Sequence, residues 1–499
     1  MSSRLRLVLA CLATAALLAP LTWFWTTSLL PEEYSVMDMG YADYGGGPAA
    51  ELQGGHTGMD PGTHAEMGAG GTSIVALTAD QERRADVKVH LRAEKREFEL
   101  ASGREVDGYT LNGDSPGPVI RAKQGQLVEV RLDNESVPEG ITLHWHGLDV
   151  PNAMDGVAGV TQDAVLEGDS FTYRFVAEQV GTYWYHTHQV SHELVRRGLL
   201  GGLVVTPRGD DPADVDALAV VHHYGGHRTI NGDEGDVSVA AASGETVRVR
   251  VVNTDNGPMP VWVSGLPYRV LAVDGTEVNE PTMVNGESVL VTAGGRADLE
   301  IAMPDDGSGA RVEMGGSAAM VLGGSRTDVP QADAPETFVD LLSYGSPTPP
   351  DFDPSNPARS FEYVIGRRPG FLDGRPGLWW TINGHMYPNV PMYMVSEGDV
   401  VKMRIENNSG EVHPMHLHGH HALVLSRDGV EATGSPWVVD SLNVADGESY
   451  DIAFVADNPG VWMDHCHNLP HAAEGLVAHL MYAGYTTPYM IGRSQNEPE

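Results

Sequence analysis

Three segments of the chain alternate apolar and polar residues with a period of two, at positions 125–134, 244–253 and 398–407. This alternation predicts a β-strand with one buried face. Each segment begins with Gly, ends with Asn and follows an Asn-Gly pair after a similar gap. We therefore expect three copies of one β-domain in series.

The rest of each copy supports this interpretation. Short stretches rich in Val, Thr and Tyr are separated by Gly, Pro, Asn and Asp, and no long amphipathic helical pattern occurs between residues 80 and 485. Such a pattern is typical of consecutive β-sandwiches, so the predicted fold class is all-β. Pro-containing stretches at 207–212 and 347–354 mark the boundaries. The expected domains are residues 74–208, 209–345 and 346–490.

The N-terminal segment predicts a membrane helix. Residues 7–30 carry no charge and follow Arg4 and Arg6. As a helix they would span about 36 Å, enough for a hydrocarbon core of about 30 Å. A cleaved signal is the alternative, but the best small-residue site, at 13–15, leaves an unusually short apolar region. We expect residues 1–36 to be an uncleaved single-pass anchor with the body on the extracytoplasmic side; cleavage would give a secreted protein.

Residues 37–73 have a different composition, rich in Gly, Pro, Met and His. Such a segment cannot bury a core, so we expect a flexible tether between the membrane and the body. Thioether and imidazole groups also bind soft metal ions. Capture of such ions by the tether is therefore an added hypothesis.

Charge and cysteine content narrow the possible functions. Lys and Arg total 31 against 68 Asp and Glu, a net charge of -37 over 499 residues, so we expect no nucleic-acid partner. Of the 2 cysteines, Cys11 lies in the apolar N-terminal run, and only Cys466 remains in the body. No intrachain disulfide can form there. The body must be stabilised by its cores or by metal.

The histidines follow a spacing that suits metal binding. Four His-x-His pairs occur, at 144/146, 186/188, 416/418 and 465/467. On a strand, residues i and i+2 point to the same face, so each pair can offer two imidazoles to one metal cluster. The recurrence of four such pairs indicates a shared metal-binding role rather than chance.

The alternation of side chains along a strand also separates a second group of candidate ligands from the His-x-His pairs. Cys466 lies between two paired histidines and points to the opposite face, while His413 stands at an odd offset from its pair and His471 follows Cys466 by five residues. A thiolate with two imidazoles, backed onto a polyhistidine cluster, suits a blue copper centre connected to a second metal site. Zinc could bind some of these groups, but it does no redox chemistry.

The motifs that carry these residues are His-Trp-His-Gly, His-Thr-His, His-Pro-Met-His-Leu-His-Gly and His-Cys-His-x-x-x-His. They closely resemble the four copper motifs of three-domain multicopper oxidases, the laccase family, and the similarity covers about residues 74–490. The resemblance implies three cupredoxin-like Greek-key β-sandwich domains and four copper ions: one type 1, one type 2 and two type 3. It also implies O2 as the electron acceptor, reduced to water.

Carried over residue by residue, the resemblance implies these ligand sets. Type 1 copper would be bound by His413, Cys466 and His471. Type 2 copper would be bound by His144 and His416. The type 3 pair would be bound by His146, His186, His188, His418, His465 and His467. The cluster of three ions would lie between the first and third domains, with Cys466 passing electrons to it through its flanking histidines.

Alignment of the repeats predicts which domains lack copper ligands. Thr187 falls opposite Cys466 and Ile141 opposite His413, so the first domain lacks type 1 copper. His192 falls opposite His471, where a structural role is the favoured interpretation. In the second domain, residues 259–265 match the His-Pro-Met-His-Leu-His-Gly motif with every histidine absent. We expect a copper-free spacer there.

Neighbouring residues suggest how the coppers are tuned. Leu476 stands ten residues after Cys466, where many family members have an axial methionine, so this position resembles that of high-potential laccases with a non-coordinating residue. Met481 is the alternative axial ligand. Asp155 matches the acidic residue thought to help deliver protons near type 2 copper, and is a catalytic candidate with Cys466.

Further residues are candidates for supporting roles. Ala472 follows His471 where many bacterial relatives have Glu, so this chain lacks a carboxylate at that position of a second proton donor, and Glu474 is the candidate substitute. Asp440 could orient a type 1 histidine or occupy an ordinary turn. For three methionines, core packing is favoured over a Cu(I) docking site. These are Met386, Met392 and Met394.

The function expected from the sequence is a laccase-like oxidase of phenolic or aromatic electron donors. The main alternative is a metallo-oxidase acting on Cu(I), Mn(II) or Fe(II) in metal tolerance, favoured by the acidic surface and the Met/His-rich segment. A third class, a scaffold of the same fold without copper, is disfavoured because a scaffold needs no histidine ligands.

Overall fold

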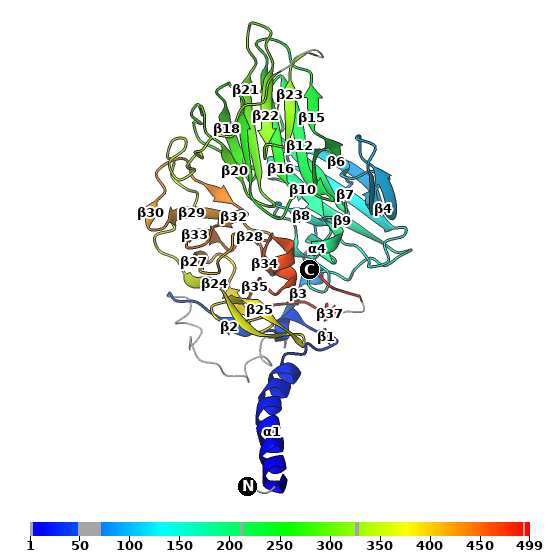
Figure 1. Cartoon of the computed structure of the whole chain (residues 1–499). Coiled ribbons are helices and arrows are strands. Elements are labelled where there is room, and N and C mark those ends of the chain that lie inside the picture. Colours follow the sequence, from blue (N-terminus) through cyan, green and yellow to red (C-terminus); the bar gives the residue numbers. More distant parts are fainter. Residues whose placement is uncertain (1–2, 48–70, 210–212, 325–328, 493–494) are drawn as a thin grey trace.

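The computed structural model describes residues 3–47, 71–209, 213–324, 329–492 and 495–499. Strands dominate these ranges, and Figure 1 shows them as stacked sheets from which one long helix projects. The prediction of an all-β body with an N-terminal helix is confirmed. The helices in the described part of the chain are α1 (Ser3–Thr27), α4 (Ser191–Leu194) and α5 (Leu469–Ala473).

The first pair of sheets encloses one apolar core. One sheet has the order β5-β4-β7-β9 and the other β6-β11-β10-β8. Their strands are β4 (Val87–Glu99), β5 (Glu105–Leu111), β6 (Gly117–Lys123), β7 (Gln126–Asn134), β8 (His144–His146), β9 (Ser170–Ala177), β10 (Gly181–His186) and β11 (Leu200–Thr206). Val130, Trp145 and Tyr173 are fully buried between them.

The second pair of sheets encloses a separate core. Its sheets have the orders β14-β13-β12-β16-β21-β18-β19 and β15-β23-β22-β17-β20. The strands are β12 (Val215–Tyr224), β13 (His227–Ile230), β14 (Asp233–Glu234), β15 (Asp236–Val239), β16 (Thr246–Asn253), β17 (Met259–Val263), β18 (Arg269–Val273), β19 (Thr276–Glu277), β20 (Val289–Val291), β21 (Arg296–Ala302), β22 (Ala310–Met314) and β23 (Ala318–Leu322). Valines fill much of this core, as expected for β-branched residues on a pleated surface.

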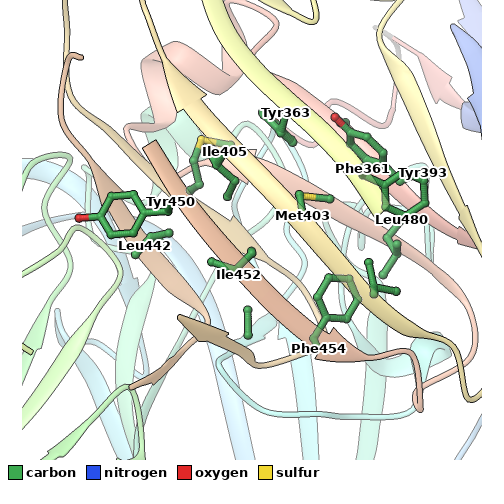
Figure 2. Packing of buried hydrophobic residues seen from close by; sticks show 14 of the residues in the cluster. Phe361, Tyr363, Tyr393, Met403, Ile405, Leu442, Tyr450, Ile452, Phe454 and Leu480 are labelled. Carbon is green, nitrogen blue, oxygen red and sulfur yellow. The ribbon is translucent and has the colours of Figure 1, made fainter. Parts of the chain in front are cut away.

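The third pair of sheets carries the aromatic core of Figure 2, in which Phe361, Tyr363 and Tyr393 pack together. The sheet orders are β25-β24-β27-β33-β29-β30, with β31 on β29, and β2-β26-β35-β34-β28-β32. The strands are β2 (Tyr41–Asp43), β24 (Arg359–Leu372), β25 (Arg375–Ile382), β26 (Pro391–Val395), β27 (Val400–Asn407), β28 (His413–Leu417), β29 (Ala422–Arg427), β30 (Val430–Glu431), β31 (Val438–Val439), β32 (Ser441–Val444), β33 (Ser449–Val455), β34 (Val461–Cys466) and β35 (Val477–Tyr482).

The three alternating segments occupy equivalent places in these sheets. They form β7, β16 and β27, and each pairs in parallel with the first long strand of its unit, β4, β12 or β24. Each also pairs antiparallel with a later strand, β9, β21 or β33. The sequence repeat therefore corresponds to a repeat of topology.

The helix α1 has no buried residue and is long and apolar enough to cross a membrane. It leads directly into the body, where the backbone of Ser28 accepts a hydrogen bond from the N–H of Asp373 at 2.9 Å. An anchor and a signal sequence both fit such a helix near the N-terminus.

The described parts of the segment expected to be a flexible tether, residues 37–47 and 71–73, lie against the body. Val36 and Met39 are buried against the third unit, and β2 adds to its sheet beside β26. Two short pairings add to this, one just before the segment and one at its end. They join β1 (Glu33–Tyr34) to β37 (Ile491–Gly492), and β3 (Thr72–Ser73) to β36 (Tyr485–Thr486). The apolar residues around Met39 supply enough buried surface to order a segment whose Gly content suggested otherwise.

The remainder of that segment, with the candidate metal-capturing residues His56, Met59, His64 and Met67, lies outside the described residues.

Candidate metal centre

A small ligand group lies where β28, β34 and α5 meet. His413 begins β28, Cys466 ends β34 and His471 lies in α5. Cys466 Sγ is 3.5 Å from His413 Nδ1 and 3.8 Å from His471 Nδ1, and the two Nδ1 atoms are 3.2 Å apart. Three ligand atoms of the predicted type 1 set thus converge on one point.

The environment of this group is apolar. Burial and the neighbouring His471 and Arg367 lower the pKa of His413 to about 3, and burial raises the pKa of the Cys466 thiol. Neutral imidazoles are ready to bind a metal, and a metal ion that replaces the thiol proton supplies the charge that stabilises the thiolate. The ring of Trp380 packs on both imidazoles, with centroids 4.7 Å from His413 and 4.4 Å from His471.

The candidate axial residues fall in different parts of the core. Leu476 is fully buried in the same apolar cluster as Cys466, and its carbonyl accepts the N–H of Cys466 at 3.1 Å. Met481 belongs to the separate cluster with Met392 and Met394. This placement favours Leu476 as the residue beside the thiolate.

The eight paired histidines form one buried cluster between the first and third units. They come from β8, from β10 and the turn after it, and from the ends of β28 and β34. Their adjacent antiparallel strands set His186 opposite His144 and His465 opposite His416. The strand pairing within each unit therefore places two His-x-His motifs side by side, as the parity of the sequence predicted.

The nitrogen atoms of this cluster divide into recognisable groups. The Nε2 atoms of His144 and His416 are 3.4 Å apart. The Nε2 atom of His465 lies 3.4 Å from that of His188 and 3.2 Å from that of His418. These are the predicted type 2 pair and half of the predicted type 3 ligands.

The other three predicted type 3 ligands face one another through their rings. The centroid of His146 lies 4.8 Å from His467 and 5.8 Å from His186, and the last two are 5.4 Å apart. His146 Nδ1, His186 Nε2 and both nitrogens of His467 are buried and have no hydrogen-bond partner in the part of the chain that the structure describes. Since orphaned buried nitrogens are costly, a metal ion fits this donor set.

Asp155 lies between two of the pairs, directly after the short helix η3 (Asn152–Met154). Its Oδ1 is 3.1 Å from His144 Nδ1 and its Oδ2 is 3.0 Å from His418 Nδ1. Accepting both Nδ1–H groups leaves the Nε2 lone pairs free to face the cluster. The carboxylate is buried with 1% exposure, so the prediction that it lies close to the type 2 ligands agrees with the geometry.

Asp440 lies elsewhere than the sequence suggested. It was a candidate to orient a type 1 histidine, but its Oδ1 is 3.2 Å from His146 Nε2 and its carbonyl accepts His416 Nδ1–H at 2.8 Å. Both neighbours belong to the larger cluster. Asp440 also forms a buried ion pair with Arg296, which no motif indicated. Asp440 is the single residue between β31 and β32, and β32 pairs with β28, the strand that carries His416.

The second unit supplies no histidine to the cluster but contacts it closely. A Cβ atom on Gly294 would lie 2.8 Å from His146 Cε1 and 3.0 Å from His467, and its φ of +78° also favours Gly. The carbonyl of Gly294 accepts Trp184 Nε1–H at 2.9 Å, and the Trp184 ring packs on His186. A lone Gly carries no sequence signal for this role.

The remaining candidates lie outside both ligand groups. Glu474 accepts Trp380 Nε1–H at 2.9 Å and so lies beside the smaller group. His192 is in α4 and belongs to neither group. The three methionines are buried in the core, as favoured from sequence: Met386, Met392 and Met394.

Comparison with known proteins agrees with this geometry. Two family models, each described as multicopper oxidase, match residues 92–210 and 354–484. Laccase-1 of Melanocarpus albomyces is 30% identical over 469 residues, 73% of this chain and 73% of its own length. The iron transport multicopper oxidase fetC of Epichloe festucae is 26% identical over 457 residues, 74% of this chain and 72% of its own. A crystal structure of a multi-copper oxidase from Pseudomonas thermotolerans is also similar, with 27% sequence identity and a TM-score of 0.67. The superposition covers 79% of this chain and 99% of that chain.

Proposed function

Because this chain belongs to the multicopper oxidase family, copper-dependent oxidoreductases that use O2, we propose that it oxidises a laccase-type phenolic or aromatic donor. Four electrons taken singly would reduce one O2 to two waters, with four protons consumed. The observation that carries this proposal is the convergence of His413, Cys466 and His471 beside a cluster of eight histidines. We assign these eleven residues to the type 1, type 2 and type 3 sites as the family motifs imply.

Within this proposal, bound copper supplies one-electron chemistry at the smaller group and O2 binding and reduction at the larger one. Cys466 is bonded through the backbone to His465 and His467, so one continuous stretch of chain joins the two groups. Asp155 holds the Nδ1–H groups of His144 and His418, and stands where it can pass a proton into the cluster.

The donor would approach the edge of His471. Its side chain is 10% exposed, and its Nε2 lies 3.1 Å from Asn468 Nδ2 and 3.3 Å from Glu411 Oε2. The Glu411 side chain is 44% exposed. A phenol that hydrogen-bonds to this carboxylate would place its ring against His471 and lose its proton to Glu411 as it is oxidised.

The same carboxylate supports the second candidate function. A divalent or cuprous ion bound by Glu411 would also be in electron-transfer contact with His471, and the net charge of -37 concentrates cations at the surface. The similarity to an iron transport oxidase is consistent with this alternative. Metal-ion oxidation is therefore the comparison that the experiment must include.

Two further features complete the proposal. We assign the three sandwich domains to residues 74–208, 209–345 and 346–490, supported by the three separate cores, with the middle domain free of copper. We also assign α1 to an uncleaved membrane anchor, with the body on the extracytoplasmic side, supported by its length and complete exposure.

Oxygen uptake by the copper-loaded protein would decide between the donors. We expect turnover with a substituted phenol to exceed turnover with Cu(I), Mn(II) or Fe(II), and Glu411→Gln to raise the KM for the favoured donor. A metal ion oxidised faster than the phenol would replace the laccase assignment with the metallo-oxidase one.

A further inference from the structure

Residues 495–499 lie against the body beside the larger histidine cluster. The backbone N–H of Val190 donates to the carbonyl of Glu497 at 2.6 Å, and the N–H of Glu497 donates to Gln189 Oε1 at 3.0 Å. Asn496 Oδ1 accepts the N–H of Ala164 at 2.9 Å. Hydrogen bonds thus hold the segment to the turn after β10, next to the histidines there, and to Ala164 before β9.

Three histidines of the cluster converge through their Nε2 atoms, and each has an acceptor on the opposite ring nitrogen. His418 Nδ1–H donates to Asp155 Oδ2 at 3.0 Å. His188 Nδ1–H donates to the carbonyl of Pro498 at 3.1 Å. His465 Nδ1 lies 2.9 Å from Glu499 Oε1. Two of the three acceptors therefore come from a segment outside every copper motif.

Glu499 contacts its neighbours through both carboxylate oxygens. Its side chain is only 7% exposed, Ser191 Oγ–H donates to its Oε2, and its Oε1 is also 3.7 Å from His188 Nε2. The contact between His465 Nδ1 and Glu499 Oε1 is close but lacks hydrogen-bond alignment, and neither atom has a hydrogen-bond partner among the described residues. A buried carboxylate and a buried imidazole nitrogen that face each other at this distance satisfy one another after a small ring rotation.

This carboxylate stands where the copper motif itself offers none. The residue after His471 is Ala472, and Glu474 is engaged with Trp380 at the smaller group. Glu499 lies beside the larger cluster, where its Oε2 accepts a hydrogen bond from the hydroxyl of Ser191 in α4.

We propose that Glu499 is a positioning residue of the type 3 site: it holds the Nδ1–H tautomer of His465 so that Nε2 is presented to copper, while Pro498 does the same for His188. This inference rests on the proposed ligand assignment. Groups that orient a metal-bound histidine in this way typically change metal affinity about 10-fold to 100-fold when removed.

The test compares copper retention in three purified, copper-loaded proteins: wild type, Glu499→Ala and Glu499→Gln. Each is titrated with a Cu(I) chelator under reducing conditions, and the copper-to-protein ratio is measured beside the blue absorption of the reoxidised protein. We expect Glu499→Ala to lose trinuclear copper at about 10-fold to 100-fold lower chelator concentration, with the blue colour retained. Glu499→Gln keeps an acceptor oxygen and should lie between the two.

Glu497→Gln is the matched control, because Glu497 is held through its backbone and should retain copper like wild type. If Glu499→Ala does not fold, Ser191→Ala, which frees Glu499 Oε2, should shift retention in the same direction. Equal chelator midpoints for wild type and the Glu499 variants would overturn the inference. A wild-type protein without blue colour or with fewer than four coppers would instead overturn the proposed function.

Discussion

Arg296 and Asp440 form a doubly hydrogen-bonded ion pair, with Nη1–Oδ1 and Nη2–Oδ2 distances that are both 2.6 Å. Both side chains are at most 1% exposed. Arg296 begins β21 in the second unit, and Asp440 precedes β32 in the third. The pair therefore fastens the two units together within reach of the metal-binding histidines.

Removal of Arg296 should destabilise the protein strongly. Arg296→Ala leaves the buried Asp440 carboxylate without its guanidinium partner, and breaking a buried ion pair in this way costs about 3–5 kcal/mol. Urea unfolding of the copper-free protein measures the effect. Arg269→Ala is the control, since Arg269 also pairs with a carboxylate at 2.6 Å but is 43% exposed, and should cost less than about 1 kcal/mol. Equal losses in the two variants would contradict this role for the buried pair.

Cys466→Ser should abolish the blue colour. The hydroxyl cannot replace the polarisable thiolate, so type 1 copper should be lost while the eight-histidine cluster, which does not use the Cys466 side chain, keeps its copper. Absorption spectra and metal analysis report the two sites separately, with about one copper fewer per protein expected. A blue Cys466→Ser protein would refute the type 1 assignment.

Asp155→Asn should slow O2 reduction without changing the colour. The amide can still accept one Nδ1–H but has no charge and cannot carry a proton, so we expect turnover to fall by about 10²–10⁴-fold. Oxygen uptake and the blue absorption are measured on the same sample. Glu167→Gln, at an exposed position near β9, is the control and should behave as wild type. Unchanged turnover in Asp155→Asn would exclude a proton-transfer role.

Leu476→Met should lower the reduction potential of type 1 copper. A thioether beside Cys466 would stabilise Cu(II), and each tenfold gain in relative Cu(II) affinity lowers a one-electron potential by about 59 mV. Because the Leu-to-Met exchange nearly conserves volume, folding should survive. Redox titration of the blue band measures the shift, and Leu480→Met adds a thioether to the same core as a control. Equal potentials in all three proteins would reject Leu476 as the axial residue.

The helix α1 should keep the protein in the membrane. Expressed in full, the chain should sediment with membranes in carbonate and retain its N-terminal residues by intact mass, whereas a variant without residues 1–30 should be released with its oxidase activity unchanged. A mature mass that lacks the helix would identify a cleaved signal instead.

The division of these side chains into two groups was predictable because it depends on a local rule. Side-chain parity on a strand separates Cys466 from His465 and His467, and in the structure Cys466 lies with His413 and His471. The three alternating strands were found for the same reason, since burial of one face imposes a period of two.

Features that depend on contacts between distant segments were not predictable. Nothing near Asp440 indicates Arg296, which lies 144 residues away, so the sequence left Asp440 either as a residue that orients a type 1 histidine or as an ordinary turn residue. Residues 37–43 looked like part of a linker by composition, yet Met39 contacts Tyr387, more than 300 residues along the chain, and is buried. Such pairings follow from how the units dock, which no local pattern encodes.

The histidine cluster takes four residues from positions 144–188 and four from 416–467. A chain still being synthesised holds only the first four until most of its length has emerged, and these four are only part of the proposed type 2 and type 3 ligand sets. Complete copper loading of this cluster must therefore follow docking of the last unit onto the first, whereas the smaller group lies within the last unit alone. Copper bound at the cluster stabilises the docked arrangement by mass action. Copper at this cluster therefore marks molecules in which the first and last units have docked.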